Sequence, residues 1–336
     1  MTVIGIFGAG SVGCYLGGRL AAAGAEVVLV GRPKLAHEVQ RHGLTVTDYL
    51  GLHQLVAPGE VVFATEAEAL AGADLVLVTV KSAATREAGE QLSRVLRPDV
   101  PVLSLQNGLH NADTLQAVMP RQPVFPGMVP FNVLHRGEGA FHQGSAGALE
   151  MQDDIRLDLL ASACARAGLA LLPRKDMKAV LWGKLLLNLN NPINALSGLP
   201  LKDELSQRSF RRCLALAQRE ALRMMRAHGI QPARLTAVPA SWLPAVMDVP
   251  DALFRRLASR MLAIDPLARS SMWEDLEAGR RTEIDWINGE VVELAAALGA
   301  HAPVNARLVS LIRAAEAGGR RDWSGAELLA ALQAAS

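Results

Sequence analysis

Three glycines near the start of the chain have the spacing of a nucleotide-binding turn. Residues 8–13, Gly-Ala-Gly-Ser-Val-Gly, match the pattern G-x-G-x-x-G between the apolar run Val3–Phe7 and the helix-like stretch Val12–Ala23. Gly8 would permit a tight turn, Gly10 would let the main chain approach a pyrophosphate, and Gly13 would let helix and strand pack closely. The helix start would then bind the phosphates through its N–H groups. The alternative is a glycine-rich turn without a ligand. The predicted cofactor-binding residues of this turn are Gly8, Ala9, Gly10, Ser11, Val12 and Gly13.

The residue after the second expected strand, Glu26–Val30, bears on the choice of cofactor. Chains that bind NAD usually carry Asp or Glu there, which accepts a hydrogen bond from the ribose 2′-hydroxyl. This chain instead has Arg32, with Lys34 close by. Because a cation suits a 2′-phosphate, the sequence predicts NADP(H) rather than NAD(H). The alternative is a solvent-exposed loop arginine.

Lys81 and Asn107 each follow an apolar run of strand type, Leu75–Val80 and Val102–Leu105. Ligands of open α/β sheets bind outside the carboxyl ends of the strands. Lys81 could therefore meet a phosphate or a ribose, and Asn107 a ribose or substrate oxygen. The pair Asn107-Gly108 is also compatible with a plain turn.

Lys184, Asn188 and Asn191 are spaced i, i+4 and i+7, which would put all three on one helix face. The residues between them are mostly leucine, so we expect the helix to be buried. A buried lysine beside two amides is costly unless it meets a partner or a ligand. We therefore favour a functional role over a solvated helix face.

Two further polar residues lie in the last third of the chain. Glu283 is flanked by Ile284 and Ile287, so we expect it to point inward and pair with Lys184. Ser271 and Glu274 have the spacing of a capping box, so helix capping alone would explain this serine.

The pattern of apolar residues divides the chain into two halves. In the first, buried strands alternate with helices, which favours a parallel sheet covered on both faces, and residues 124–149 fit a few further strands. From about Asp176 onward the period is helical, and Asp176 itself can cap a helix after Pro173. We therefore expect domains at 1–174 and 175–336, with an irregular connection at 239–250. The expected helices of the second half are Leu181–Leu189, Ser209–Ala227, Leu276–Leu298 and Val304–Ala317.

Composition narrows the class of protein. The 336 residues suggest about two domains, and 34 Lys+Arg against 33 Asp+Glu argue against a nucleic-acid or membrane partner. The three cysteines have no metal-ligand spacing, so we expect reduced core thiols, no metal site and a cytoplasmic protein. The uncharged first 18 residues lack a basic region and are broken by glycines, unlike a signal peptide.

Together these segments resemble the ketopantoate reductase (2-dehydropantoate 2-reductase) family. The resemblance rests on the glycine turn with Arg32, on Lys81 and Asn107, and on the stretches WGKLLLNLNNP (182–192), SSM (270–272) and TEIDWING (282–289), and it covers nearly the whole chain. It implies an α/β N-terminal Rossmann-type NADP-binding domain. It also implies an all-helical C-terminal domain of the 6-phosphogluconate dehydrogenase C-terminal-like type. NADPH would be the cofactor and ketopantoate the substrate, in the pathway to pantothenate.

The resemblance also implies roles for single residues. Lys184 matches the catalytic lysine, which is the proton donor, and Ser271 matches the serine that binds the substrate carboxylate. The family often has a second asparagine four residues after the first, where this chain has Pro192; the best match is Asn191, shifted by one residue. The other matches are Asn188 for substrate binding, Glu283 beside the cofactor and the lysine, and Lys81 and Asn107 for cofactor contact, with Asn107 also reaching the substrate.

The implied reaction is hydride transfer from C4 of NADPH to the C2 carbonyl of the substrate. Lys184, with an ordinary pKa of about 10.4, would stabilise the developing charge and deliver a proton, while Glu283 keeps it charged and aimed. Ser271 and Glu283 are twelve positions apart. On one straight helix that is about 18 Å, so either they contact different parts of the ligands or the helix breaks near Gly279.

Two other functions stay open at this point. One is a different NADPH-dependent reductase of the same build, acting on another 2-oxo acid, a hydroxy acid or a glycerol phosphate. The other is a regulator that binds NADPH without catalysis. The expected partners are a small 2-oxo acid and, in a homodimer, a second copy of the chain.

Overall fold

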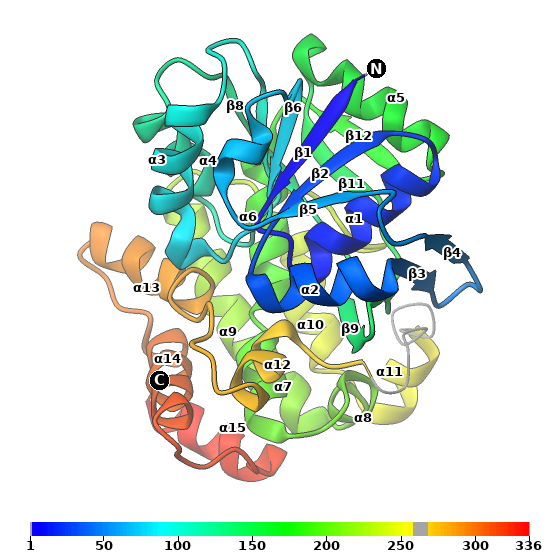
Figure 1. The fold of residues 1–336 in the computed structure, drawn as a ribbon. Helices are drawn as coiled ribbons and strands as arrows, with labels where there is room; N and C mark the ends of the chain where they lie inside the picture. Colours follow the sequence, from blue (N-terminus) through cyan, green and yellow to red (C-terminus); the bar gives the residue numbers. More distant parts are fainter. Residues whose placement is uncertain (1, 258–267, 336) are drawn as a thin grey trace. The chain divides into compact units, whose positions relative to one another are not determined.

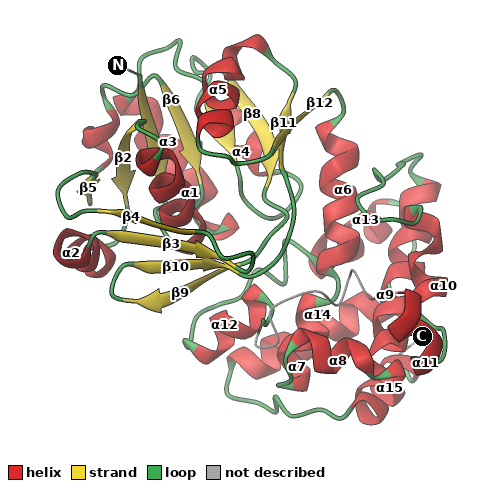
Figure 2. Cartoon of the chain, turned by 90° about the vertical axis from the view of Figure 1, so that its right-hand side faces the viewer, coloured by secondary structure: helices red, strands yellow, loops and turns green. Residues whose placement is uncertain are grey.

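The computed structural model describes residues 2–257 and 268–335, which form two compact units, Met1–Met177 and Lys178–Ser336 (Figure 1). The first unit is an α/β structure and the second is helical (Figure 2). None of the helices in the described part of the chain is both long and apolar enough to cross a bilayer.

An eight-stranded sheet forms the centre of the first unit. Its strands run in the order β12-β11-β8-β7-β6-β1-β2-β5, and all neighbours are parallel except β11 and β8. The expected parallel sheet is therefore confirmed. The strands are β1 (Val3–Phe7), β2 (Glu26–Val30), β5 (Val62–Ala64), β6 (Leu75–Val78), β7 (Val102–Ser104), β8 (Val124–Met128), β11 (Leu149–Gln152) and β12 (Leu171–Arg174).

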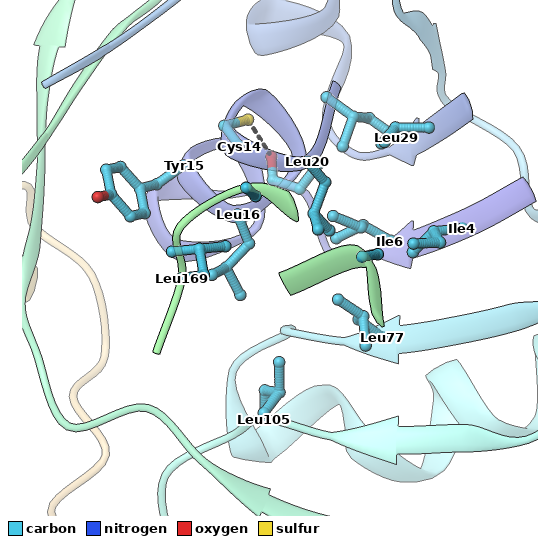
Figure 3. Packing of buried hydrophobic residues seen from close by; sticks show 14 of the residues in the cluster. Ile4, Ile6, Cys14, Tyr15, Leu16, Leu20, Leu29, Leu77, Leu105 and Leu169 are labelled. Carbon is cyan, nitrogen blue, oxygen red and sulfur yellow. Dashed lines mark hydrogen bonds between the residues drawn. The ribbon is translucent and has the colours of Figure 1, made fainter. Parts of the chain in front are cut away.

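Both faces of this sheet are buried, and its central strands β1 and β6 are apolar at every position. Ile6 pairs with Leu29 and Leu77, and these three side chains pack in one core with helix α1 (Ser11–Ala22) (Figure 3). The alternate residues, such as Val76 and Val78, form a second core on the opposite face. The remaining helices of this unit are α2 (Pro33–His42), α3 (Thr85–Val95), α4 (Asn111–Val118) and α5 (Asp158–Arg166).

A second, four-stranded sheet packs its apolar side chains into the same core as α1, and the sequence patterns did not predict it as a separate sheet. Its order is β4-β3-β10-β9. Leu44, Val46 and Phe141 have almost no exposed surface in this core. The strands are β3 (Leu44–Asp48), β4 (His53–Val56), β9 (Val133–Gly137) and β10 (Ala140–Gln143).

Within its described residues the second unit contains ten α-helices, a short 3-10 helix at Ala240–Trp242 and no strand. The expected helix at 276–298 is wrong as one element, because it is interrupted between Glu277 and Asn288. The expected irregular connection at 239–250 is also wrong in part, since residues 243–247 form a short helix. The helices are α6 (Met177–Asn188), α7 (Asn191–Ser197), α8 (Leu201–Ser206), α9 (Arg208–Ala227), α10 (Leu243–Met247), α11 (Asp251–Leu257), α12 (Ser271–Glu277), α13 (Asn288–Ala297), α14 (Pro303–Glu316) and α15 (Gly325–Gln333).

Candidate functional site

The glycine turn between β1 and α1 has a backbone that only glycine can adopt at its first position. Gly8 has a φ of +94°, and a Cβ there would lie 2.5 Å from the Val80 main-chain nitrogen. The N–H groups of Gly8 and Ala9 both donate to the carbonyl of Val30, at 2.9 and 2.8 Å. The turn is therefore held against the ends of β2 and β6.

Gly13 and Gly10 lack side chains for different reasons. A Cβ on Gly13 would lie 2.7 Å from Thr79 Oγ1 and 3.1 Å from Ile6 Cγ2, so α1 could not pack as closely on the sheet. A Cβ on Gly10 would meet nothing nearer than the Gly8 carbonyl oxygen at 3.8 Å, and the φ of Gly10 is −95°. The protein's own packing does not require glycine at position 10, which leaves room for a ligand there.

The start of α1 can bind an anion. The first N–H groups of any helix have no partner within the helix, and its amino end carries partial positive charge. The first turn of α1 contains no acidic residue, and the N-cap, Gly10, offers no side chain to those N–H groups. The residues present therefore fit the pyrophosphate of a dinucleotide.

Arg32 lies directly beyond β2 as the N-cap of α2, and its side chain is exposed. A Cβ on the preceding Gly31 would lie 2.9 Å from the Ala9 carbonyl oxygen, so this strand end touches the glycine turn. Lys34 is exposed two residues further on. Arg32 thus follows directly on the strand end that touches the glycine turn, where an adenosine ribose would be expected.

Lys81 and Asn107 lie at the carboxyl ends of the neighbouring strands β6 and β7, as predicted. Ser82 Oγ donates to the Asn107 carbonyl oxygen at 2.7 Å, and Asn111 Nδ2 donates to the same oxygen. The two loops are therefore tied together beside the glycine turn. Gly108 has a φ of +98°, so a turn is present as well.

Lys184 and Asn188 share one face of α6, among buried Trp182, Leu185 and Leu186. The side chain of Lys184 keeps part of its surface exposed, but burial still lowers its pKa to about 8. The expectation of an ordinary lysine pKa is therefore wrong, because removal from water disfavours the charged form.

Asn191 does not share the helix face of Lys184, contrary to the prediction. Helix α6 ends at Asn188, and Asn191 is the first residue of α7. The physical cause is Pro192, which has no N–H group and whose ring would clash with the carbonyl of Asn188 in a continuing helix. Lys184 and Asn188 thus come from one helix and Asn191 from the next.

Ser271 does not cap α12; the capping-box prediction is wrong by one residue. Ser270 has extended backbone angles, and its Oγ accepts from the Trp273 N–H at 3.2 Å. Asn194 Oδ1 accepts from the Ser270 N–H at 2.9 Å, while Ser270 Oγ donates to the Asn191 carbonyl at 3.2 Å. Ser271 is the first residue of α12, and capping does not use its hydroxyl.

Ser270 and Asn194 are residues that the sequence patterns missed. The capping pattern favours Ser271, which has Glu274 three residues later, whereas Trp273 stands at that distance from Ser270. Only the hydrogen bonds of Ser270 with Trp273 and Asn194 show that Ser270 is the N-cap. The contact with Asn194 joins α7 to α12. It places Asn191 and Ser271, which were both predicted to bind substrate, on adjoining helix starts.

Glu283 lies in an irregular segment between α12 and α13 and is buried. Helix α12 ends at Glu277, and Gly279 follows with a φ of +62°. Of the two arrangements that the spacing of Ser271 and Glu283 left open, the break near Gly279 is confirmed. Ser271 and Glu283 therefore do not lie on one straight helix.

Comparison with known proteins matches this arrangement to one family. Residues 4–154 match the model of ketopantoate reductase PanE/ApbA, and residues 176–316 match the model of its C-terminal part. The chain belongs to the ketopantoate reductase family. It is accordingly a dinucleotide-binding oxidoreductase with an N-terminal Rossmann-like unit and a helical C-terminal unit, and the fold and family expected from the sequence are confirmed.

Individual relatives of this ketopantoate reductase family member align over nearly their whole length. A 2-dehydropantoate 2-reductase of Halobacterium salinarum is 30% identical, over 93% of this chain and 98% of the relative. A ketopantoate reductase family structure from Ralstonia eutropha is 31% identical, with a TM-score of 0.80 over 94% of this chain and 99% of that one. D-mandelate dehydrogenase, solved with NADH and anilino(oxo)acetate, is 20% identical with a TM-score of 0.77 over 94% and 99%, and so shares the fold.

Proposed function

We propose that this protein reduces ketopantoate (2-dehydropantoate) to pantoate with NADPH, as a step of pantothenate synthesis. The observation that carries the proposal is Lys184, an amino group with a pKa of about 8 on helix α6 of a ketopantoate reductase family chain. We assign cofactor binding to residues 1–174 and substrate binding to residues 175–336.

The proposed cofactor site is the glycine turn with the starts of α1 and α2. NADPH, when bound, supplies the hydride. The N–H groups of α1 would bind its pyrophosphate, and Arg32 would bind the 2′-phosphate by a charge-assisted hydrogen bond. Lys81 and Asn107 would contact the nucleotide from the ends of β6 and β7. NADP(H) is preferred over NAD(H) in this proposal because no carboxylate occupies the position of Arg32.

The proposed acid is the Nζ atom of Lys184. At pH 7 an amine with a pKa of about 8 is still mostly protonated, yet it releases its proton more readily than an ordinary lysine. Its positive charge would stabilise the negative charge that develops on the C2 oxygen, and its proton would neutralise that oxygen. Glu283, which is buried, would hold the ammonium charged and aimed.

The remaining polar residues would orient the substrate. Ser271 would bind the carboxylate with its hydroxyl, and Asn107, Asn188 and Asn191 would bind the oxygens along the rest of the molecule. Hydrogen bonds of this kind hold the substrate in a reactive geometry, which makes the reaction of the bound substrate faster than the same reaction in solution.

One departure favours a second candidate substrate class. Pro192 stands where the family often has an asparagine, and Asn191 belongs to α7 rather than α6. A changed contact at the hydroxyl end of the substrate would suit a 2-oxo acid that lacks this hydroxyl. The second candidate is therefore NADPH-dependent reduction of a related 2-oxo acid.

The test is NADPH oxidation with ketopantoate beside analogues that lack the hydroxyl or one methyl group. We expect the highest kcat/KM for ketopantoate. A higher value for the analogue without the hydroxyl would select the second candidate. Tight NADPH binding without turnover of any 2-oxo acid would contradict both and indicate a binding protein.

A further inference from the structure

The segment that carries Glu283 has no regular structure of its own. Residues 278–287 connect α12 to α13, and we call them the carboxylate loop. Within the loop, the Glu283 carbonyl accepts from the Trp286 N–H at 3.1 Å, which forms a turn after this residue. Residues 278–282 lie in no helix or strand, so contacts between the loop and its neighbours help to fix the direction of Glu283.

Glu316, the last residue of α14, forms hydrogen bonds with Thr282, the residue of the carboxylate loop that precedes Glu283. Its Oε1 atom accepts from the Thr282 N–H at 2.7 Å and from Thr282 Oγ1 at 2.8 Å. Thr282 Oγ1 in turn accepts from the Ile284 N–H at 3.3 Å. The main chain on both sides of Glu283 is thus held through one threonine, which is itself buried.

The same helix also holds the far end of the loop. Asn288 Nδ2 donates to Asn305 Oδ1 at 3.0 Å, and the Asn305 N–H donates to Glu220 of α9 at 2.9 Å. Asn288 and Asn305 have no exposed surface. Helix α14 therefore contacts the carboxylate loop at Thr282 and the start of α13 at Asn288, and α9 fixes the helix in place.

We propose that Glu316 is a positioning residue that aims Glu283 by acting through Thr282. The inference rests on the proposed function, because it takes Glu283 as the partner of the proton donor. Two hydrogen bonds from an N–H and a hydroxyl to one carboxylate oxygen are charge-assisted and directional. Their loss would leave the Thr282 N–H buried without its partner and would free the backbone at Glu283.

The chain offers a matched control on the same two elements. Arg313 of α14 pairs with Asp285 of the carboxylate loop at 2.7 Å, but both side chains are largely exposed, at 62% and 48%. This pair joins the same helix to the same loop on the solvent side. Removing it tests whether any link between the two elements is enough.

The experiment compares Glu316→Ala, Glu316→Gln and Arg313→Ala in the full chain, with NADPH and ketopantoate. We expect Glu316→Ala to lower kcat roughly tenfold or more, since small displacements of catalytic groups are costly. Glu316→Gln keeps an oxygen that can accept both hydrogen bonds, so it should retain most of the activity. Arg313→Ala should leave kcat within about twofold of the wild type, as expected for an exposed ion pair.

A double variant separates positioning from general damage. If Glu316 acts through Glu283, the variant Glu283→Gln/Glu316→Ala should have the same kcat as Glu283→Gln alone. If instead the double variant loses kcat by the product of the two single losses, the inference is overturned. An unchanged kcat in Glu316→Ala would also overturn it. Impaired Glu283→Gln with normal Glu316→Ala refutes only the positioning role. Normal Glu283→Gln refutes the role of Glu283 in the proposed function itself.

Amide hydrogen exchange gives a readout that does not depend on turnover. Residues 282–287 should exchange faster in Glu316→Ala than in the wild type, and Arg313→Ala should leave them unchanged. Equal protection in Glu316→Ala and the wild type would show that Glu316 does not hold the loop, and would overturn the inference.

Discussion

Lys184 shows how burial in the protein changes the pKa of one side chain. Its side chain is partly removed from water, and the cost of keeping a charge there lowers its pKa to about 8. At neutral pH the ammonium persists, so it can both attract negative charge and release a proton. A fully exposed lysine would keep a pKa above 10 and would release its proton less readily.

We predict that kcat falls as the pH rises through about 8, because the proposed acid loses its proton there. Lys184→Ala should lower kcat by roughly 100-fold or more and remove this decline. Lys178→Ala, an exposed lysine of the same helix, is the control and should change neither. Steady-state rates between pH 6 and pH 10 check this, and an unchanged profile in Lys184→Ala would contradict the assignment.

Arg32 decides the preference for the nucleotide in the proposed function. We predict that Arg32→Ala raises the KM for NADPH roughly tenfold or more, which corresponds to loss of a charged hydrogen bond worth about 1.5–3 kcal/mol. The KM for NADH should hardly change, because NADH has no 2′-phosphate. The exposed Arg41 at the other end of α2 provides the control variant, Arg41→Ala. Equal changes for both nucleotides would rule out a 2′-phosphate contact.

At the scale of the element, Gly13 and Gly10 of the glycine turn lack a side chain for different reasons. Gly13 is small because α1 packs closely on β1 and Thr79, whereas Gly10 has open space beside it. The sequence pattern names both positions but does not tell them apart. Only the distances show which glycine serves the fold and which leaves room for a ligand.

Because of this difference, we predict different effects when Gly13 and Gly10 are each replaced by alanine. Gly13→Ala should lower the melting temperature, since its new methyl group would lie 2.7 Å from Thr79 Oγ1. Gly10→Ala should melt like the wild type but bind the nucleotide more weakly, because the methyl group would occupy the approach to the helix start. Thermal melting and NADPH fluorescence titration measure the two effects. Wild-type affinity in Gly10→Ala would show that no ligand approaches there.

The elements that were easy to predict are those with a single apolar pattern. Strands β1 and β2 have the predicted bounds, since fully buried parallel strands are continuous apolar runs. The helix break at Gly279 was harder to predict, because residues 278–287 contain no proline and a single glycine does not by itself end a helix. The second sheet was missed because strands such as β4 are short and mostly exposed on one side.

The positions of the candidate residues depend on contacts that are distant in the sequence. Lys81, Asn107 and the glycine turn could be predicted because strand ends in a parallel sheet share one edge. Ser270 and Glu316 could not, since their partners Asn194 and Thr282 are 76 and 34 positions away. The spacing of neighbouring residues does not reveal contacts between residues that are so far apart in the sequence.

At the scale of the whole molecule, a buried acid that no sequence pattern singled out bears on how stability responds to pH. Glu204 of α8 has no exposed surface, and its Oε2 accepts from Asn190 Nδ2 at 2.9 Å. Burial raises the pKa of Glu204 to about 8, although Asn190, Asn194 and the guanidinium of Arg211 oppose this shift. Arg211 is itself fully buried, with its Nη1 and Nε atoms donating to the carbonyls of Leu205 and Met247.

The raised pKa predicts how folding responds to pH. In the unfolded chain a glutamate has a pKa of about 4.3, so between that value and about 8 the folded protein holds a proton that the unfolded chain has released. The contribution of Glu204 to stability is therefore complete at low pH and is lost as the pH rises through this window. One such group accounts for at most about 1.4 kcal/mol per pH unit.

We predict that Glu204→Gln flattens this dependence, because glutamine is uncharged at every pH and can still accept a hydrogen bond from Asn190. The variant should melt at nearly the same temperature as the wild type near pH 5 and at a higher temperature near pH 8. Glu293→Gln, which alters an exposed residue of α13, should melt in parallel with the wild type throughout. If the wild type and Glu204→Gln differ by the same amount at pH 5 and pH 8, then Glu204 is ionised in the folded protein across this range, and its burial does not keep it protonated.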